Sequence, residues 1–134
     1  MLAAMILGAD GVQVGSRFVA SNEASSHFNF KNALVNAVEG DTVLTLKELT
    51  PVRLLKNNFY EQIQSAYDRN ASSAELGELL GKGRAKKGMF QGDINEGELE
   101  IGRVSALINE IKPAAEIVKE IWLQFNQALN MPVK

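Results

Sequence analysis

The spacing of apolar residues predicts a mainly helical chain. Apolar side chains recur at helical intervals in residues 28–38, 52–67 and 114–129, which indicates three amphipathic helices. Pro51 and Pro113 precede two of these stretches, where proline is compatible with the first turn of a helix. Most of the chain is therefore expected to pack through one apolar face of each helix.

Shorter segments complete the helical pattern. Residues 2–7 have the composition of the last two turns of a helix, residues 74–80 follow a turn and a capping serine, and residues 101–111 are a short apolar helix candidate. The glycine-rich residues 81–97 change from basic to acidic, so we expect an ordered excursion that separates two helical blocks. Pro132 is expected to end the last helix.

Two segments favour strands instead. Residues 11–15 alternate valine with glutamine between glycines, as in a short central strand, and Ser16 then opens a helix. This helix–strand–helix order indicates parallel α/β topology, which needs flanking parallel strands. Residues 42–49 are the other β-like run. One core strand cannot form a sheet by itself, so the topology looks incomplete.

Composition narrows the possible functions. The 134 residues suit one domain, the net charge is −2, and the chain has no cysteine and one histidine. These counts exclude a disulfide framework, a thiolate metal site and a multi-histidine metal cluster, and they give no support to nucleic-acid binding. The apolar start lacks a basic signal-peptide region, and no stretch approaches a membrane span. We expect a cytoplasmic protein with no nucleic-acid or membrane partner and no metal site.

Gly15 and Ser16 are the first candidates for chemistry. A glycine at the carboxyl end of a parallel strand lets a ligand approach the backbone, and a small hydroxyl with exposed N–H groups can bind a phosphate. The alternative is purely structural: Gly15 permits a tight turn and Ser16 caps a helix. The pattern alone leaves both interpretations open.

Several ordered blocks resemble one enzyme family. Residues 2–21 and 27–34, followed by 41–45, 51–57 and 92–102, are similar to the C-terminal part of the nitronate monooxygenases, formerly called 2-nitropropane dioxygenases, and to their relative the FMN-dependent enoyl-acyl-carrier-protein reductase. That family folds as a (β/α)8 TIM barrel with a helical appendage and binds FMN at the carboxyl ends of its strands. The resemblance covers nearly the whole chain.

The resemblance implies a single partial domain, residues 1–134, that is α/β by descent and mostly α in this chain. Residues 1–38 would hold the last helix of the barrel, its eighth strand and the following helix, and residues 39–134 the mainly helical appendage. Seven strands and the catalytic histidine of the family would lie upstream of Met1. No catalytic residue is therefore expected in this chain.

The FMN site is the part of the family's machinery that this chain would contribute. The resemblance implies four residues that hold the FMN phosphate, namely Gln13, Val14, Gly15 and Ser16. Loops around Gly92 and Gly102 would close one side of the pocket. Where the family commonly has an Ala-Gly-Gln-Ser-like run, this chain has Arg103 in place of glutamine and a serine displaced to Ser105.

Other residues have a structural explanation beside any functional one. His27 precedes a helix and is expected to act as a cap or a surface hydrogen-bonding group. Arg17 is expected either to contact the phosphate or to form an outer salt bridge. The basic run of residues 82–87 is expected to be solvated. The stripe containing Trp122 and Phe125 is expected to seal the appendage against the barrel.

We hypothesise that the chain is the C-terminal part of an FMN-dependent oxidoreductase that oxidises alkyl nitronates with oxygen. The alternatives are part of an enoyl-acyl-carrier-protein reductase, with an enoyl thioester as substrate, and a non-catalytic helical interaction module. Apolar faces left uncovered by absent strands would favour a homo-oligomer or association with the missing N-terminal half. We expect the isolated chain to be inactive and to bind FMN weakly or not at all.

Overall fold

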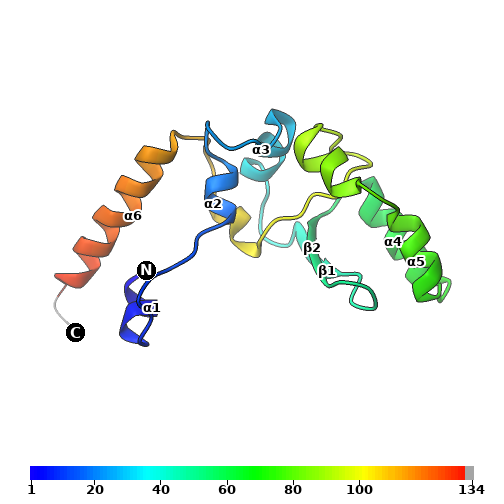
Figure 1. The fold of residues 1–134 in the computed structure, drawn as a ribbon, viewed down its shortest axis with the longest axis horizontal. Coiled ribbons are helices and arrows are strands. Elements are labelled where there is room, and N and C mark those ends of the chain that lie inside the picture. The colour runs from blue at the N-terminus through cyan, green and yellow to red at the C-terminus, as the bar shows by residue number, and fades with distance from the viewer. Residues whose placement is uncertain (132–134) are drawn as a thin grey trace.

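The computed structural model describes residues 1–131 and shows an elongated arch (Figure 1). The helices α2 and α3 and the small sheet lie in the middle, α4 and α5 form one limb, and α1 and α6 form the other. The elements in chain order are α1 (Leu2–Ile6), α2 (Ser16–Val19), α3 (Phe28–Val35), β1 (Thr42–Thr45), β2 (Val52–Leu55), α4 (Asn58–Asp68), α5 (Ser73–Leu80), the π-helix η1 (Lys86–Phe90), the 3-10 helix η2 (Arg103–Leu107) and α6 (Ala114–Leu129).

The sheet is an antiparallel hairpin of β1 and β2, in which Thr42 lies opposite Leu55. Residues 99–101 run along the other edge of β2. The Leu55 N–H donates to the Leu99 carbonyl over 3.0 Å, and the Ile101 N–H donates to the Arg53 carbonyl over 3.0 Å. The backbone of β2 is therefore engaged on both sides.

This pairing corrects the prediction of a helix over residues 52–67. Residues 52–55 are strand, and the helix begins only at Asn58. Asn57 marks the change, because its side-chain oxygen accepts a hydrogen bond from the Tyr60 N–H over 3.0 Å and so caps α4. The apolar residues of β2 fit either periodicity, and partner strands distant in sequence decide between them.

The strand predicted over residues 11–15 does not form in this structure. These residues have no assigned secondary structure and are exposed. Their backbone N–H groups form no hydrogen bond within residues 1–131. A parallel strand exists only through pairing with neighbours, and no segment within residues 1–131 pairs with this one. The strand prediction is corrected for this chain for that reason.

Other predicted elements are confirmed at different lengths. α1, α5 and α6 match their predicted ranges closely, and Ser72 and Glu75 form a reciprocal capping box at the start of α5. The β-like run of residues 42–49 keeps strand geometry only to Thr45. The helix predicted over residues 28–38 ends at Val35. Residues 101–111 contain a 3-10 helix and not an α-helix. The stop expected at Pro132 lies outside the described residues.

Two clusters of buried apolar side chains stabilise the arch. The central cluster joins α3 to β2, residues 99–101 and the segment after η2; its buried members are Ala20, Phe30, Leu34, Ala37, Leu55, Leu99, Ile101 and Ile108. The second cluster lies between the hairpin, α4 and α5; its buried members are Leu46, Leu54, Phe59, Ile63, Ala66 and Leu76. Neither cluster includes α1.

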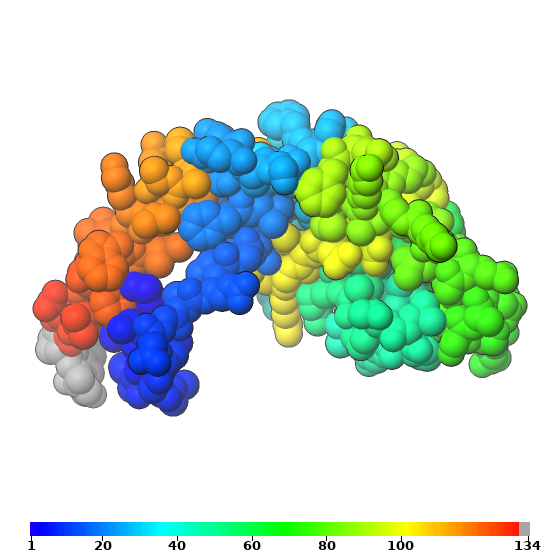
Figure 2. Space-filling model, viewed as in Figure 1, coloured from blue at the N-terminus to red at the C-terminus, as the bar shows by residue number. Residues whose placement is uncertain are grey.

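The arch leaves much of its surface uncovered (Figure 2). The chain exposes 8599 Å², whereas a compact monomer of 14.6 kDa exposes about 6,900 Å². The only buried residue of α6 is Ile117, and the Trp122 side chain is 60% exposed although it stacks on Phe125. Among residues 1–131, Trp122 therefore does not make the expected sealing contact, whereas Phe125 is half-buried and α6 contacts α1 and α2. No helix in the described part of the chain is long and apolar enough to cross a membrane.

The fold predicts an unequal cost for alanine at two glycines. A Cβ on Gly97 would overlap Gly88 Cα and the Asp93 carbonyl oxygen, because the π-helix lies directly against residue 97. Gly97→Ala should destabilise the chain by about 1–3 kcal/mol, since backbone must move to relieve the overlap. The measurement is the urea midpoint followed by circular dichroism.

Gly77→Ala is the matched control. Gly77 lies inside α5 and has no atom within 4 Å of an added Cβ. Alanine should stabilise the chain there by about 0.5–1 kcal/mol, because glycine is a poor helix former. Equal midpoints for the two variants would show that the contact between Gly97 and the π-helix is not close in solution.

Candidate functional site

The predicted phosphate-binding segment meets residue 102 at the centre of the arch. Ser16 is the first residue of α2, and its Oγ accepts a hydrogen bond from the Gly102 N–H over 3.1 Å. A Cβ on Gly102 would lie 2.7 Å from this oxygen, so glycine permits the approach. Because Oγ acts as the acceptor, its own proton stays free for another acceptor.

The backbone around Ser16 offers further donors. The N–H groups of Gly15, Ser16 and Arg17 donate no hydrogen bond within the described residues. The Gly15 carbonyl is engaged, because it accepts from the N–H groups of Phe18 and Val19. A run of free N–H groups beside a hydroxyl is the donor set that an anion such as a phosphate requires.

Gly15 has no structural reason within this chain to be glycine. An added Cβ would meet no atom within 4 Å, and the φ angle of −100° is open to any residue. The prediction that Gly15 permits a tight turn therefore gains no support from the structure. Space beside this backbone is left for a ligand or for another polypeptide segment.

A shallow hollow of about 370 Å³ lies between this segment and β2, with Arg53 and Glu100 on its rim. Its lining residues are Gly15, Ser16, Val19, Pro51, Val52, Arg53, Glu100, Ile101 and Gly102. The charge of Arg53 favours an anion nearby, although its guanidinium also donates to the Thr42 carbonyl over 3.1 Å, whereas the charge of Glu100 opposes an anion. The free donors and Arg53 fit a phosphate, and Glu100 is the one group in the lining that does not.

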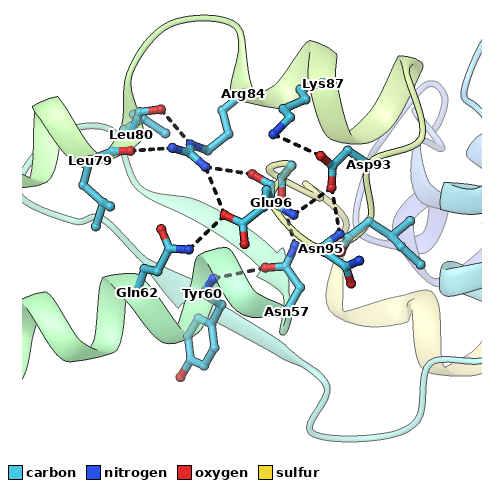
Figure 3. A network of polar contacts seen from close by, with 12 residues as sticks. Asn57, Tyr60, Gln62, Leu79, Leu80, Arg84, Lys87, Asp93, Asn95 and Glu96 are labelled. Carbon is cyan, nitrogen blue, oxygen red and sulfur yellow. Dashed lines mark hydrogen bonds and ion pairs between the residues drawn. The ribbon is translucent and has the colours of Figure 1, made fainter.

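A polar network holds residues 93–97, the loop that leads to residues 99–102 (Figure 3). The Arg84 guanidinium donates to the carbonyls of Leu79, Leu80 and Glu96 over 2.8–2.9 Å. It also lies 4.3 Å from the centre of the Phe59 ring. Arg84 therefore ties the end of α5 to the segment that leads to Gly102.

Asn57 and Asp93 hold the same loop from its other side. The Asn57 side chain donates to the carbonyls of Ile94 and Gly97 over 3.0 and 2.8 Å (Figure 3). Asp93 accepts from the Glu96 N–H and pairs with Lys87 at 3.0 Å. The Glu96 N–H and Lys87 together lower the pKa of the Asp93 carboxyl. The glycine-rich excursion is thus ordered, as predicted.

Glu98 is the buried acid of this region, only 6% exposed. Burial raises the pKa of its carboxyl above the ordinary 4.5, the nearby charge of Glu100 raises it further, and Arg84 partly opposes the rise. The folded chain therefore keeps a proton on Glu98 at pH values where the unfolded chain has lost it.

The structure separates several residues that the sequence placed near the pocket. Gly92 does not reach the hollow; a Cβ there would overlap the ring of His27, and its φ angle of +81° requires glycine. His27 caps α3 by accepting from the Asn29 N–H over 3.1 Å, which confirms the expected capping role. Of the two loops expected to close the pocket, only the one at Gly102 lies beside Ser16.

The arginines also differ from expectation. Arg17 does not form the predicted salt bridge among residues 1–131, because its guanidinium donates to the Glu110 carbonyl over 3.1 Å; its contact with a phosphate stays a prediction. Arg103 is 79% exposed and lies 3.8 Å from Glu39. Ser105 is fully buried with no hydrogen-bond partner for its hydroxyl within residues 1–131, so it cannot contact a substrate from this position.

In the basic run of residues 82–87, Lys82, Lys86 and Lys87 are exposed as predicted, whereas Arg84 corrects the prediction. The Arg84 side chain is only 22% exposed and donates to three carbonyls, and Lys87 forms the ion pair with Asp93. Sequence reasoning missed this role because a cluster of lysine and arginine is typical of exposed surface. The conspicuous signal, five glycines around the cluster, indicated order but not which cation is buried.

Residues 1–124 match the family model described as nitronate monooxygenase. The chain belongs to the nitronate monooxygenase family. It is 27% identical over 132 residues to a probable nitronate monooxygenase of Staphylococcus saprophyticus and 29% identical over 130 residues to one of Staphylococcus aureus. These matches cover 97% and 96% of this chain but 36% of each relative. The chain thus spans little more than a third of the length of these family members.

Solved structures agree with the family. The chain superposes on FabK from Thermotoga maritima with a TM-score of 0.85 and 35% identity, and on a mutant of that FabK with a TM-score of 0.80. Each match covers 96% of this chain, and 41% and 38% of the respective FabK chains. The predicted fold class, a mostly helical part of a barrel enzyme, is confirmed.

The raised pKa of Glu98 predicts a pH dependence. Because the folded chain binds the extra proton, its free energy of unfolding should fall as the pH rises from about 4.5 through the raised pKa of Glu98. Glu98→Gln should remove the loss of stability that is due to ionisation of Glu98. The urea midpoint of the variant should therefore rise relative to that of the wild type as the pH increases. The measurement is a series of urea midpoints between pH 4 and roughly 8.

Two further variants check the cause. Glu100→Gln removes the neighbouring charge and should reduce the pH-dependent difference without abolishing it. Glu78→Gln changes an exposed carboxylate of α5 and should leave the profile unaltered. Parallel profiles for wild type and Glu98→Gln would contradict the assignment.

Proposed function

We propose that this chain supplies the phosphate-binding edge of an FMN site in a flavin-dependent oxidoreductase of the nitronate monooxygenase type, which oxidises alkyl nitronates with oxygen. The observation that carries the proposal is the junction of Ser16 with Gly102. This junction leaves the Ser16 hydroxyl proton and the neighbouring backbone N–H groups of residues 15–17 free, in a chain that belongs to this family.

The four residues proposed to hold the phosphate have distinct roles. Gln13 and Val14 carry the exposed backbone that leads to the site, Gly15 leaves room for close approach, and Ser16 donates its hydroxyl proton. Arg53 adds a favourable charge at the rim. When bound, FMN supplies the redox chemistry, and this chain contributes orientation and electrostatics.

We propose that another polypeptide segment supplies the remaining surface of the site. The chain spans 36% of the length of the nitronate monooxygenases that it matches, and it exposes about a quarter more surface than a compact monomer of its mass. We propose as its partner a segment equivalent to the rest of such an enzyme. A homo-oligomer is the competing arrangement.

An enoyl-acyl-carrier-protein reductase is the second candidate, with an enoyl thioester as substrate. The likeness to FabK favours it, because the identity of 35% exceeds the 27–29% found with the probable nitronate monooxygenases. Residues that contact substrate would distinguish the two reactions. We propose no substrate contact for any residue of the described part of this chain.

Co-expression tests the proposal. The chain is produced with the part of the Staphylococcus saprophyticus protein that it does not match, and the complex is isolated by size exclusion. Flavin absorbance measures FMN content. Oxygen uptake with an alkyl nitronate and nicotinamide oxidation with an enoyl thioester separate the two reactions. A complex without flavin would contradict the proposal, and a discrete oligomer of the chain alone would favour the interaction module.

We expect the isolated chain not to quench FMN fluorescence at sub-micromolar concentration, because it presents only one edge of the site. Tight binding by the isolated chain would show that no partner is needed. In the complex, Gly15→Val should abolish FMN retention, since a branched side chain would block the approach of the phosphate to the backbone. Gly77→Ala, which is remote in α5, should retain the flavin. A fully loaded Gly15→Val complex would refute the site.

A further inference from the structure

Lys31 is a buried cation with an unusual set of partners. It lies on α3 and is 6% exposed. Its ammonium donates to the carbonyls of Ser21, Asn22 and Ala24 over 2.6, 3.2 and 2.9 Å. These three carbonyls, here called the carbonyl cradle, belong to the loop between α2 and α3. All three protons of the ammonium group are therefore used.

The hydrogen-bond partners of the Lys31 ammonium within residues 1–131 are all uncharged carbonyls. No ion pair of Lys31 occurs among residues 1–131, although five other ion pairs do. A ring of backbone carbonyls without a carboxylate is the ligand set by which proteins bind monovalent cations such as K⁺. Divalent cations instead take carboxylate oxygens. The carbonyl cradle thus has the chemistry of a monovalent-cation site.

The carbonyl cradle is also the junction between the centre of the arch and α6. The Asn22 N–H donates to the Lys112 carbonyl over 2.9 Å, and the Ala114 N–H donates to the Glu23 carboxylate over 2.8 Å. α2, which begins at Ser16, leads directly into the same loop. A cation in the cradle therefore fixes the start of α6 and the end of α2 together.

We propose that the carbonyls of residues 21, 22 and 24 form a monovalent-cation site whose permanent occupant is the Lys31 ammonium, and that free NH₄⁺ or K⁺ binds there when Lys31 is replaced by alanine. The inference is independent of the flavin proposal. Removal of the side chain leaves both the carbonyl ligands and the volume of the ammonium group. A free cation can then occupy the place of Nζ.

The test compares Lys31→Ala with Lys31→Met in the full chain. Melting temperatures are measured by circular dichroism in ammonium chloride, potassium chloride and tetramethylammonium chloride at equal ionic strength. Both variants should melt below the wild type in tetramethylammonium chloride. Lys31→Ala should gain at least about 3 °C in ammonium chloride, a shift that corresponds to a modest change in stability for a chain of this size. Potassium should give a gain of the same sign.

Lys31→Met is the matched control, because its thioether chain fills the space of the lysine stem and leaves no room for a cation. It should show the same melting temperature in all three salts, as should the wild type. A Lys31→Ala chain that is unfolded in tetramethylammonium chloride should regain helical signal on transfer to ammonium chloride. Loss of structure in every salt, equal melting of Lys31→Ala in all salts, or wild-type stability of Lys31→Met would each overturn the proposal.

Discussion

The pairing of residues 99–101 with β2 is the interaction on which the other parts of the structure depend. It adds a third extended segment to a two-stranded hairpin, which by itself is marginal in water. Its two faces serve different buried clusters, because Leu55 and Leu99 pack with α3 while Leu54, which points to the opposite face of β2, packs with α4. The same pairing brings Gly102 to Ser16. Fold and candidate site therefore rest on one set of backbone hydrogen bonds.

The position of residues 99–101 is itself set by groups outside the sheet. Arg84 and Asn57 hold the loop before them by its carbonyl oxygens, and the close approach of Gly97 to the π-helix leaves that loop little freedom. Carbonyls held by side chains in this way do not depend on strand partners. This explains how a short, irregular segment is placed well enough to present one N–H group to a serine 86 positions away.

Local signals predicted the helices, and long-range pairing limited the rest. α5 and α6 carry their own caps or a preceding proline, so residues near in sequence determine their bounds. Residues 52–55 have no such local signal, and their state depends on β1 and on residues 99–101. For the site, the sequence identified Ser16 and the neighbourhood of Gly102. It could not identify the bond between them or the burial of Arg84 and Lys31, because those depend on which loops meet in space.

The exposed backbone of residues 11–15 has a consequence for the chain before any ligand binds. Its unpaired N–H groups, flanked by the apolar side chains of Val12 and Val14, form an edge that can template pairing with any extended segment. A second molecule presenting the same edge would compete with the partner segment proposed above. Self-association and pairing with the partner segment then compete. Which of them prevails depends on the concentrations of the two competitors as much as on their affinities. Synthesis of the chain close to the proposed partner segment would favour pairing with that segment over self-association.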